Sequence, residues 1–221
     1  MRTNPLGIAV LVLRSMEKYV KHHIVLAAAM LLLAGVCHAG IITLSGTISG
    51  ANENPATPSP GTGFALVTLN TTAQTLEVNV VFSNLLAFIP GTSTPSGTTA
   101  SHIHCCVAPP GNAGVATTTP SFTGFPLGVD SGSFDRVLDL TMASSYNPAF
   151  VTAQGSLAAA ETALENGLIN SQTYLNIHTN AFPGGEVRAF LTPTPEPTTV
   201  ALTLSGFGGL WLVRRRLRFQ R

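Results

Sequence analysis

Short runs rich in β-branched and aromatic residues, each ended by Gly, Pro, Ser, Thr or Asn, make up most of the middle of this chain. Runs of this kind are typical of strands joined by turns. Between Leu76 and Phe82 every second side chain is apolar, whereas Glu77 would lie on the opposite face, because side chains alternate along a strand. We therefore expect an all-β fold, an antiparallel β-sandwich, with a partly closed barrel as the alternative. The predicted strands cover residues 41–48, 63–69, 75–82, 133–142, 173–179 and 186–191.

One short helix is expected within this β-rich region. Ser156 is suited to cap the run 157–164, and Gly167 to end it. The segments 83–100 and 108–130 are rich in Pro, Gly, Ser and Thr and are predicted to be long loops. Long loops often carry functional residues.

The N-terminal segment, residues 1–39, has the pattern of a signal peptide. Basic residues precede an unbroken apolar run, 24–36, which is too short for a stable membrane span but suits a signal helix. Residues 37–39 then give the small-any-small pattern that signal peptidase cleaves. The translation start is left open between Met1 and Met16.

The C-terminal segment, residues 193–221, combines Pro195-Glu196-Pro197, an apolar stretch at 198–213 and an arginine cluster at 214–218. This order resembles the bacterial PEP-CTERM sorting tail. The resemblance implies recognition by an exosortase, cleavage near the Pro-Glu-Pro motif and release to the cell surface or extracellular matrix. A transmembrane tail with cytoplasmic arginines agrees with the positive-inside rule. A plain C-terminal membrane anchor is the alternative.

The segment between the two ends, residues 40–192, is long enough for one domain with its own core. It contains two basic side chains, Arg136 and Arg188, eight acidic ones and no lysine. Two against eight gives a formal charge of about −6, although the whole chain carries +1. Binding to nucleic acid needs clustered Lys and Arg, so we do not expect a nucleic-acid partner.

Three histidines remain once the two ends are set aside, His102 and His104 in Ser101-His-Ile-His and His178 in Asn176-Ile-His-Thr. Both segments are strand-like, and alternation puts His102 and His104 on one face. If the strand with His178 is a neighbour, three imidazoles converge, a ligand set that suits zinc or copper. The alternative is that these are ordinary surface or hydrogen-bonded histidines.

Four motifs resemble the successive motifs of the CHRD domain, which is named after chordin. They are Gly50-Ala-Asn-Glu-Asn-Pro55, Gly61-Thr-Gly-Phe-Ala-Leu-Val-Thr-Leu69, Ala100-Ser-His-Ile-His104 and the segment 174–188 with His178, Pro183, Gly184, Gly185, Glu186 and Arg188. The resemblance covers about residues 42–191 and implies a secreted β-sandwich module. It implies little about biochemical activity.

The turn Pro183-Gly184-Gly185 is expected to join the strands 173–179 and 186–191 as a hairpin. Such a hairpin brings Glu186 and Arg188 close to His178 and Asn176. We expect these polar residues around the ligands, with Glu186 accepting a hydrogen bond from an imidazole or pairing with an arginine. Glu53, in the loop 50–55, is expected to serve that loop rather than the site.

Adjacent cysteines, Cys105 and Cys106, stand where the CHRD family usually has glycine after the second histidine. Cys37 would leave with the signal peptide, so these two have three fates: a disulfide with each other, additional metal ligands, or bonds to another molecule. As thiolate ligands they would favour zinc or cuprous copper.

Together these features predict an exported protein that binds copper or zinc through His102, His104 and His178. The alternative is a metal-free matrix or adhesion module that binds polysaccharide or protein. We do not expect an enzyme, because three histidines fall short of the ligand set of copper-zinc superoxide dismutases and no Ser-His-Asp arrangement is suggested. The expected partners are signal peptidase and exosortase during export, the membrane before processing, and extracellular polysaccharide.

Overall fold

The computed structural model describes residues 40–194. The predicted signal peptide, the motif Pro195-Glu196-Pro197 and the arginine cluster lie outside the described residues. Within the described part of the chain, no helix is long and apolar enough to cross a membrane.

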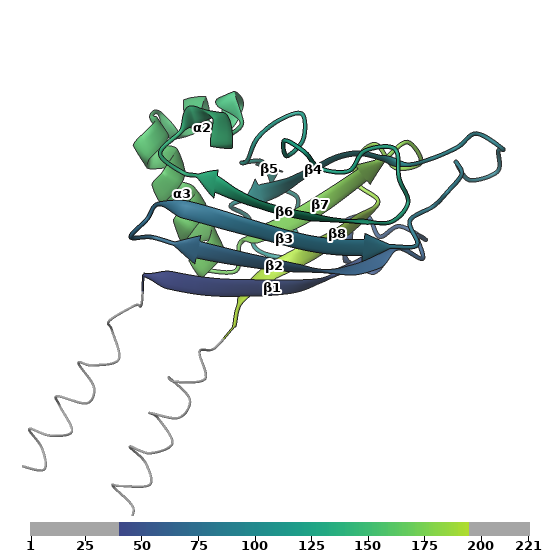
Figure 1. Cartoon of the computed structure of the whole chain (residues 1–221), viewed down its shortest axis with the longest axis horizontal. Coiled ribbons are helices and arrows are strands. Elements are labelled where there is room, and N and C mark those ends of the chain that lie inside the picture. Colours follow the sequence, from purple (N-terminus) through teal and green to yellow (C-terminus); the bar gives the residue numbers. More distant parts are fainter. Residues whose placement is uncertain (1–39, 195–221) are drawn as a thin grey trace, which may run out of the picture. The chain divides into compact units, whose positions relative to one another are not determined.

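The eight strands of residues 40–194 form one antiparallel sheet, which curls around its core (Figure 1). The strands lie side by side in the order β5-β4-β7-β8-β1-β2-β3-β6. Their bounds are β1 Ile41–Ser49, β2 Thr62–Asn70, β3 Thr75–Ser83, β4 Thr98–Cys105, β5 Gly114–Val115, β6 Gly132–Asp139, β7 Thr173–Thr179 and β8 Val187–Pro193. The mostly β, antiparallel fold is thus confirmed, but one curled sheet replaces the two sheets of a sandwich. Alternation marks one buried face in either architecture, so the pattern alone does not separate them.

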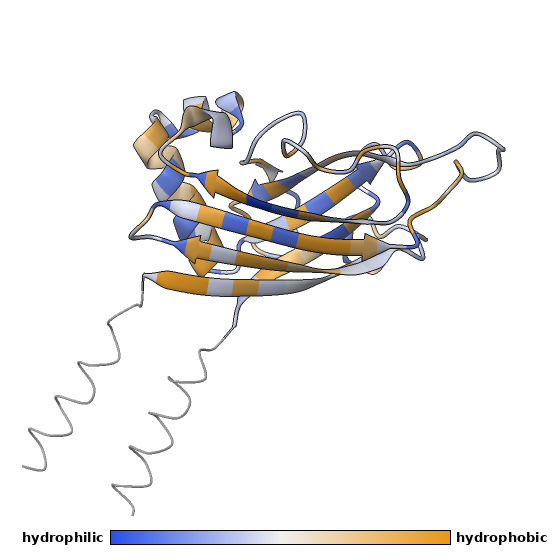
Figure 2. Ribbon diagram, in the orientation of Figure 1, coloured by the Kyte–Doolittle hydropathy of each residue, from blue (hydrophilic) through white to orange (hydrophobic). Residues whose placement is uncertain are grey.

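The core lies against one face of this sheet, which we call the inner face. On β2 and β3 every second residue is apolar and buried, as in Leu76, Val78, Val80 and Phe82. Figure 2 shows the alternation of apolar and polar residues along β3. The other face, called here the outer face, carries the alternate side chains.

The segment between β5 and β6, predicted to be a loop, closes the core between the two edges of the sheet. Its backbone bonds to β4, for example from the amide of Phe122 to the carbonyl of Ser101 at 3.0 Å. Its phenylalanines reach the opposite edge, where the rings of Phe122 and Phe125 lie 5.5 and 5.4 Å from the ring of Phe134 on β6. Contacts between aromatic rings, one stacked and one tilted, therefore join the two edges where no strands pair.

Two helices, α2 (Pro148–Gln154) and α3 (Leu157–Ile169), lie between β6 and β7, where one was predicted. Ser156 caps α3 as expected, because its Oγ accepts a hydrogen bond from the amide of Ala159 at 3.1 Å. Gly167, however, does not end the helix. A side chain there would collide with the Sγ atom of Cys105, so this glycine permits close packing of α3 on β4. Short 3-10 turns occupy Gly50–Asn52 (η1) and Ala143–Ser145 (η2).

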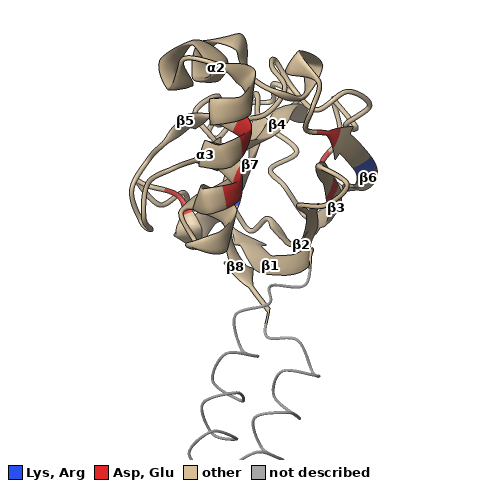
Figure 3. Ribbon diagram, turned by 90° about the vertical axis from the view of Figure 1, so that its left-hand side faces the viewer, with Lys and Arg blue, Asp and Glu red and all other residues tan. Residues whose placement is uncertain are grey.

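Charged side chains are sparse over the described residues, and most are acidic. Glu161 and Glu165 lie on α3, and further carboxylates lie on β3 and β6 (Figure 3). The two arginines differ in setting, since Arg136 on β6 is exposed and Arg188 on β8 is buried.

Candidate metal centre

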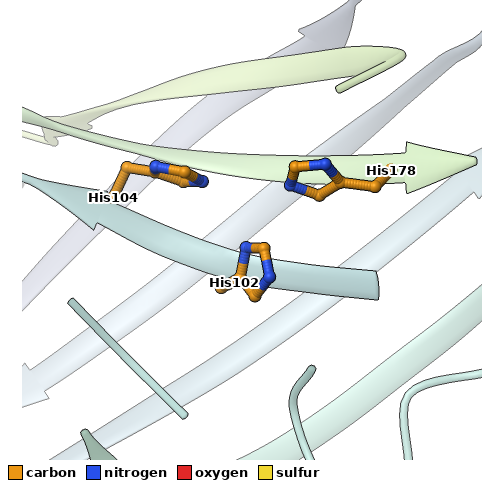
Figure 4. A group of neighbouring side chains, drawn as sticks. All are labelled: His102, His104 and His178. Carbon is orange, nitrogen blue, oxygen red and sulfur yellow. The ribbon is translucent and has the colours of Figure 1, made fainter. Parts of the chain in front are cut away.

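The three histidines meet on the outer face of two neighbouring strands, β4 and β7. The two strands pair antiparallel, with Ala100 opposite His178 and His102 opposite Asn176. His178 is therefore diagonal to His102, a distance that imidazole side chains can span. Figure 4 shows the three rings pointing toward one another.

The distances between the rings are short. The ring centroid of His102 lies 4.8 Å from that of His178 and 5.4 Å from that of His104, and the centroids of His104 and His178 are 6.2 Å apart. One ring nitrogen from each residue lies within 4.8 Å of the other two. The convergence expected from strand alternation is present in the structure.

Each imidazole is oriented by one backbone carbonyl. His102 Nε2 lies 3.0 Å from Pro120 O, His104 Nδ1 lies 2.8 Å from Ala113 O, and His178 Nδ1 lies 2.8 Å from Pro183 O. A carbonyl can only accept, so each of these ring nitrogens carries the proton and donates. The second nitrogen of each neutral ring then has a free lone pair. These atoms, His102 Nδ1, His104 Nε2 and His178 Nε2, are buried and have no hydrogen-bond partner among the described residues.

The rings are held in the neutral form. Burial, with a smaller contribution from the neighbouring histidines, lowers the pKa of both His102 and His104 to about 4. Burial also lowers the pKa of His178, and the positive charge of Arg188 contributes in the same direction. Neutral imidazole is the form that ligates metals.

An ion pair is buried beside the histidines on the same face. Arg188 Nη2 lies 2.6 Å from Glu53 Oε2. The same nitrogen also donates a hydrogen bond to the side-chain oxygen of Asn112 at 2.9 Å. Asn176 donates from Nδ2 to Glu53 Oε1 at 3.1 Å. Burial raises the pKa of Glu53, against the opposing effects of Arg188 and Asn176. Glu53 therefore belongs to the surroundings of the site and not only to its own loop.

Tyr174, which the sequence analysis did not single out, connects this ion pair to the histidines. The guanidinium carbon of Arg188 lies 4.1 Å from the centroid of the Tyr174 ring, and the His104 ring stacks on Tyr174 at 4.6 Å and 9°. The tyrosine hydroxyl accepts from the amide of Ala113 at 3.1 Å. Because the carbonyl of Ala113 holds His104, Tyr174 supports this ligand twice. The sequence contained one indication of this role. Tyr174 precedes Asn176 by two residues and His178 by four, so all three lie on the same face of the strand.

Residues 44–191 match the CHRD domain family. The chain belongs to the CHRD domain family. No curated protein and no solved structure matches the chain.

Glu186 holds loops of the CHRD domain rather than a histidine. Its carboxylate accepts from Ser59 Oγ at 2.6 Å, from the backbone amide of Leu86 at 2.7 Å and from the Thr179 hydroxyl. It does not bond to an imidazole or to an arginine. Glu186 was expected to accept a hydrogen bond from an imidazole. That role belongs instead to the backbone carbonyls of Pro120, Ala113 and Pro183.

Cys105 and Cys106 form a disulfide with each other and lie away from the histidines. The Cys105 side chain shares the inner face with Ile103, whereas His102 and His104 occupy the outer face. Both Sγ atoms contact the carbonyl of Ala163 on α3. The two cysteines are therefore not positioned as additional ligands.

Proposed function

We propose that this exported CHRD-domain protein binds a copper or zinc ion through His102 Nδ1, His104 Nε2 and His178 Nε2. The observation that carries the proposal is the pattern of hydrogen bonds. All three rings donate from one nitrogen to a backbone carbonyl and leave a buried, unpartnered lone pair on the other, within 4.8 Å of the rest. Leaving such atoms unpaired costs free energy unless something binds them.

The donor set favours these metals over calcium or magnesium. Three neutral nitrogens suit zinc and copper, whereas calcium and magnesium require oxygen ligands. Nitrogen ligands of a zinc ion lie roughly 3.3 Å apart, so these nitrogens, which stand within 4.8 Å of one another, would approach by up to about 1.5 Å on binding. His178 is only partly buried, so an ion and a further ligand can approach the site from the side of this residue. We propose binding, and not catalysis, as the function.

The two ends of the chain support a location outside the cytoplasm. We propose that signal peptidase removes residues 1–39 and that an exosortase acts at Pro195-Glu196-Pro197 after the apolar stretch has engaged the membrane. The mature domain would then reach the cell surface or the extracellular matrix. The masses of the cell-bound and released forms measure both cleavages, and a released form that retains residues 198–221 would contradict the second one.

Elemental analysis of natively exported protein is the direct test of metal binding. We expect about one copper or zinc per chain, and calorimetric titration of the metal-free protein should give the same stoichiometry. The double variant H102A/H178A removes two of three ligands and should lower the affinity about a thousandfold or more, while the β-type circular dichroism spectrum stays intact.

A matched control is the double variant E161Q/E165Q on α3. It removes two partly exposed carboxylates, which could themselves bind a metal, from α3 (Figure 3), and it should leave affinity and stoichiometry unchanged. If H102A/H178A binds metal as the unchanged protein does, the site is elsewhere. If neither metal binds to the metal-free protein, the histidines serve only as hydrogen-bonding groups.

A further inference from the structure

A groove of about 310 Å³ lies on the outer face of the sheet, over β1 and between its neighbours β8 and β2. Thr47 on β1 pairs with Phe64 on β2. The register of β1 with β8, in which Ser45 is opposite Thr192 and Ser49 is opposite Arg188, puts Phe190 on the other side of Thr47. Two aromatic rings therefore flank a row of small side chains.

The lining of the groove combines aromatic rings with uncharged hydrogen-bonding groups. Phe64 is 49% exposed, although it lies on a strand whose alternate residues are fully buried. Thr47 lies between the rings, and the hydroxyls of Ser45 and Thr192, which are opposite each other, line the groove further along the strands. Asn52 closes one end and donates from Nδ2 to the carbonyls of Thr47 and Arg188, so its side-chain oxygen is the group that it offers to a ligand.

No charged side chain lines this groove, although the domain as a whole is acidic. An anionic ligand would meet no cation there, and a cationic one no carboxylate. Sugars have the complementary chemistry, because the C–H face of a pyranose ring packs on an aromatic ring while its hydroxyls bond to Ser, Thr and Asn. We propose that the groove between Phe64 and Phe190 binds a neutral polysaccharide chain.

The spacing of the two rings agrees with a chain of sugars rather than a single one. Phe64 and Phe190 stand on strands separated by one intervening strand, and two strand spacings are roughly 9 to 10 Å. This is about the length of a disaccharide unit, so each ring can pack on alternate residues of an extended chain. The groove volume is also within the common range for ligand sites.

Affinity electrophoresis of the full chain tests the proposal in gels that contain hydroxyethyl cellulose, glucomannan or dextran. The protein is kept in a polyoxyethylene detergent, which carries no sugar. We expect retardation by at least one of these polysaccharides. F64A should lower the association constant about tenfold, the equivalent of one lost aromatic contact. F190L keeps apolar volume beside Tyr174 but removes the aromatic face, and should have a similar effect.

The control is V137A, which truncates another exposed side chain of the outer face, 57% exposed and outside the groove. It should leave retardation unchanged. Absence of retardation by all three polysaccharides, or equal losses in V137A and F64A, would overturn the proposal. So would a dimer in sedimentation experiments that F64A converts to monomer, because a second copy would then occupy the groove. H102A/H178A should still be retarded, so this proposal and the metal proposal fail separately.

Discussion

The outer face of the sheet differs between its two halves. On β2 and β3 the outer side chains are mostly exposed, and only the inner face is buried. On β4 and β7 nearly every residue is buried on both faces. The loop after β1 and the loop after β4 cover this half and bond to each other, from Asn54 to Pro110 and from Asn112 to Asn54.

The covered half is also where buried polar residues collect. His102, His104, Asn176 and Arg188 all lie on its outer face, and a strand that only served the core would bury apolar residues there. Each of these groups has a role in the hydrogen-bond network or a free lone pair within the histidine cluster. The covered half of the outer face therefore holds a buried polar site, whereas on β2 and β3 the same face is open to solvent.

The largest expected effect of this difference is on stability at acid pH. His102 and His104 have a pKa of about 4 in the folded chain and about 6.5 when unfolded. The unfolded chain then binds more protons between these values, so the free energy of unfolding falls as the pH drops from about 6.5 to about 4. The shift corresponds to roughly 3 kcal/mol for each ring. Urea unfolding of metal-free protein across this range measures it.

The comparison protein for that experiment is H102Q/H104Q, which keeps every carboxylate of the domain. Its stability should fall much less between pH 6.5 and pH 4 than that of the unchanged sequence. Parallel pH profiles for the two proteins would show that the rings are not buried in the neutral form.

Much of this organisation follows from local sequence patterns. The features that the sequence did not predict are those that have no such pattern. Alternation placed His102 and His104 together, and the Pro183-Gly184-Gly185 turn brought β7 next to β8. The role of Glu53 was missed because an irregular loop has no periodicity that predicts where its side chains point. The carbonyls of Pro120, Ala113 and Pro183 were missed because every residue has a carbonyl, and only the folded loops select these three.

The choice between one curled sheet and two sheets was missed for a different reason. It depends on which distant strands pair, here β8 with β1, and a single strand pattern does not contain that information. The contacts of Phe122 and Phe125 with Phe134 likewise could not be predicted, because they depend on where the loop between β5 and β6 lies.

The two arginines of the described residues should differ in their contribution to stability. Arg188 is buried against Glu53 in the covered half, and R188M would leave that carboxylate without its cation, at a cost of about 3 to 5 kcal/mol. Arg136 is exposed on β6 and donates to the carbonyl of Thr123 at 3.2 Å. R136M should cost less than about 1 kcal/mol. Denaturant unfolding at neutral pH separates the two, and equal costs would mean that the two halves do not differ in electrostatic burial.

The smallest expected effect separates the two faces of β4 within the covered half. C105A/C106A removes both sulfurs from the side of the strand that faces α3, while His102 and His104 remain on the other. Because the sulfurs are not directed at the imidazoles, metal affinity should stay within about twofold, a difference of less than 0.5 kcal/mol. Calorimetric titration with zinc measures this. A tenfold loss of affinity would show instead that the cysteines act as ligands, and that the alternation of side chains along β4 does not isolate the metal centre from its opposite face.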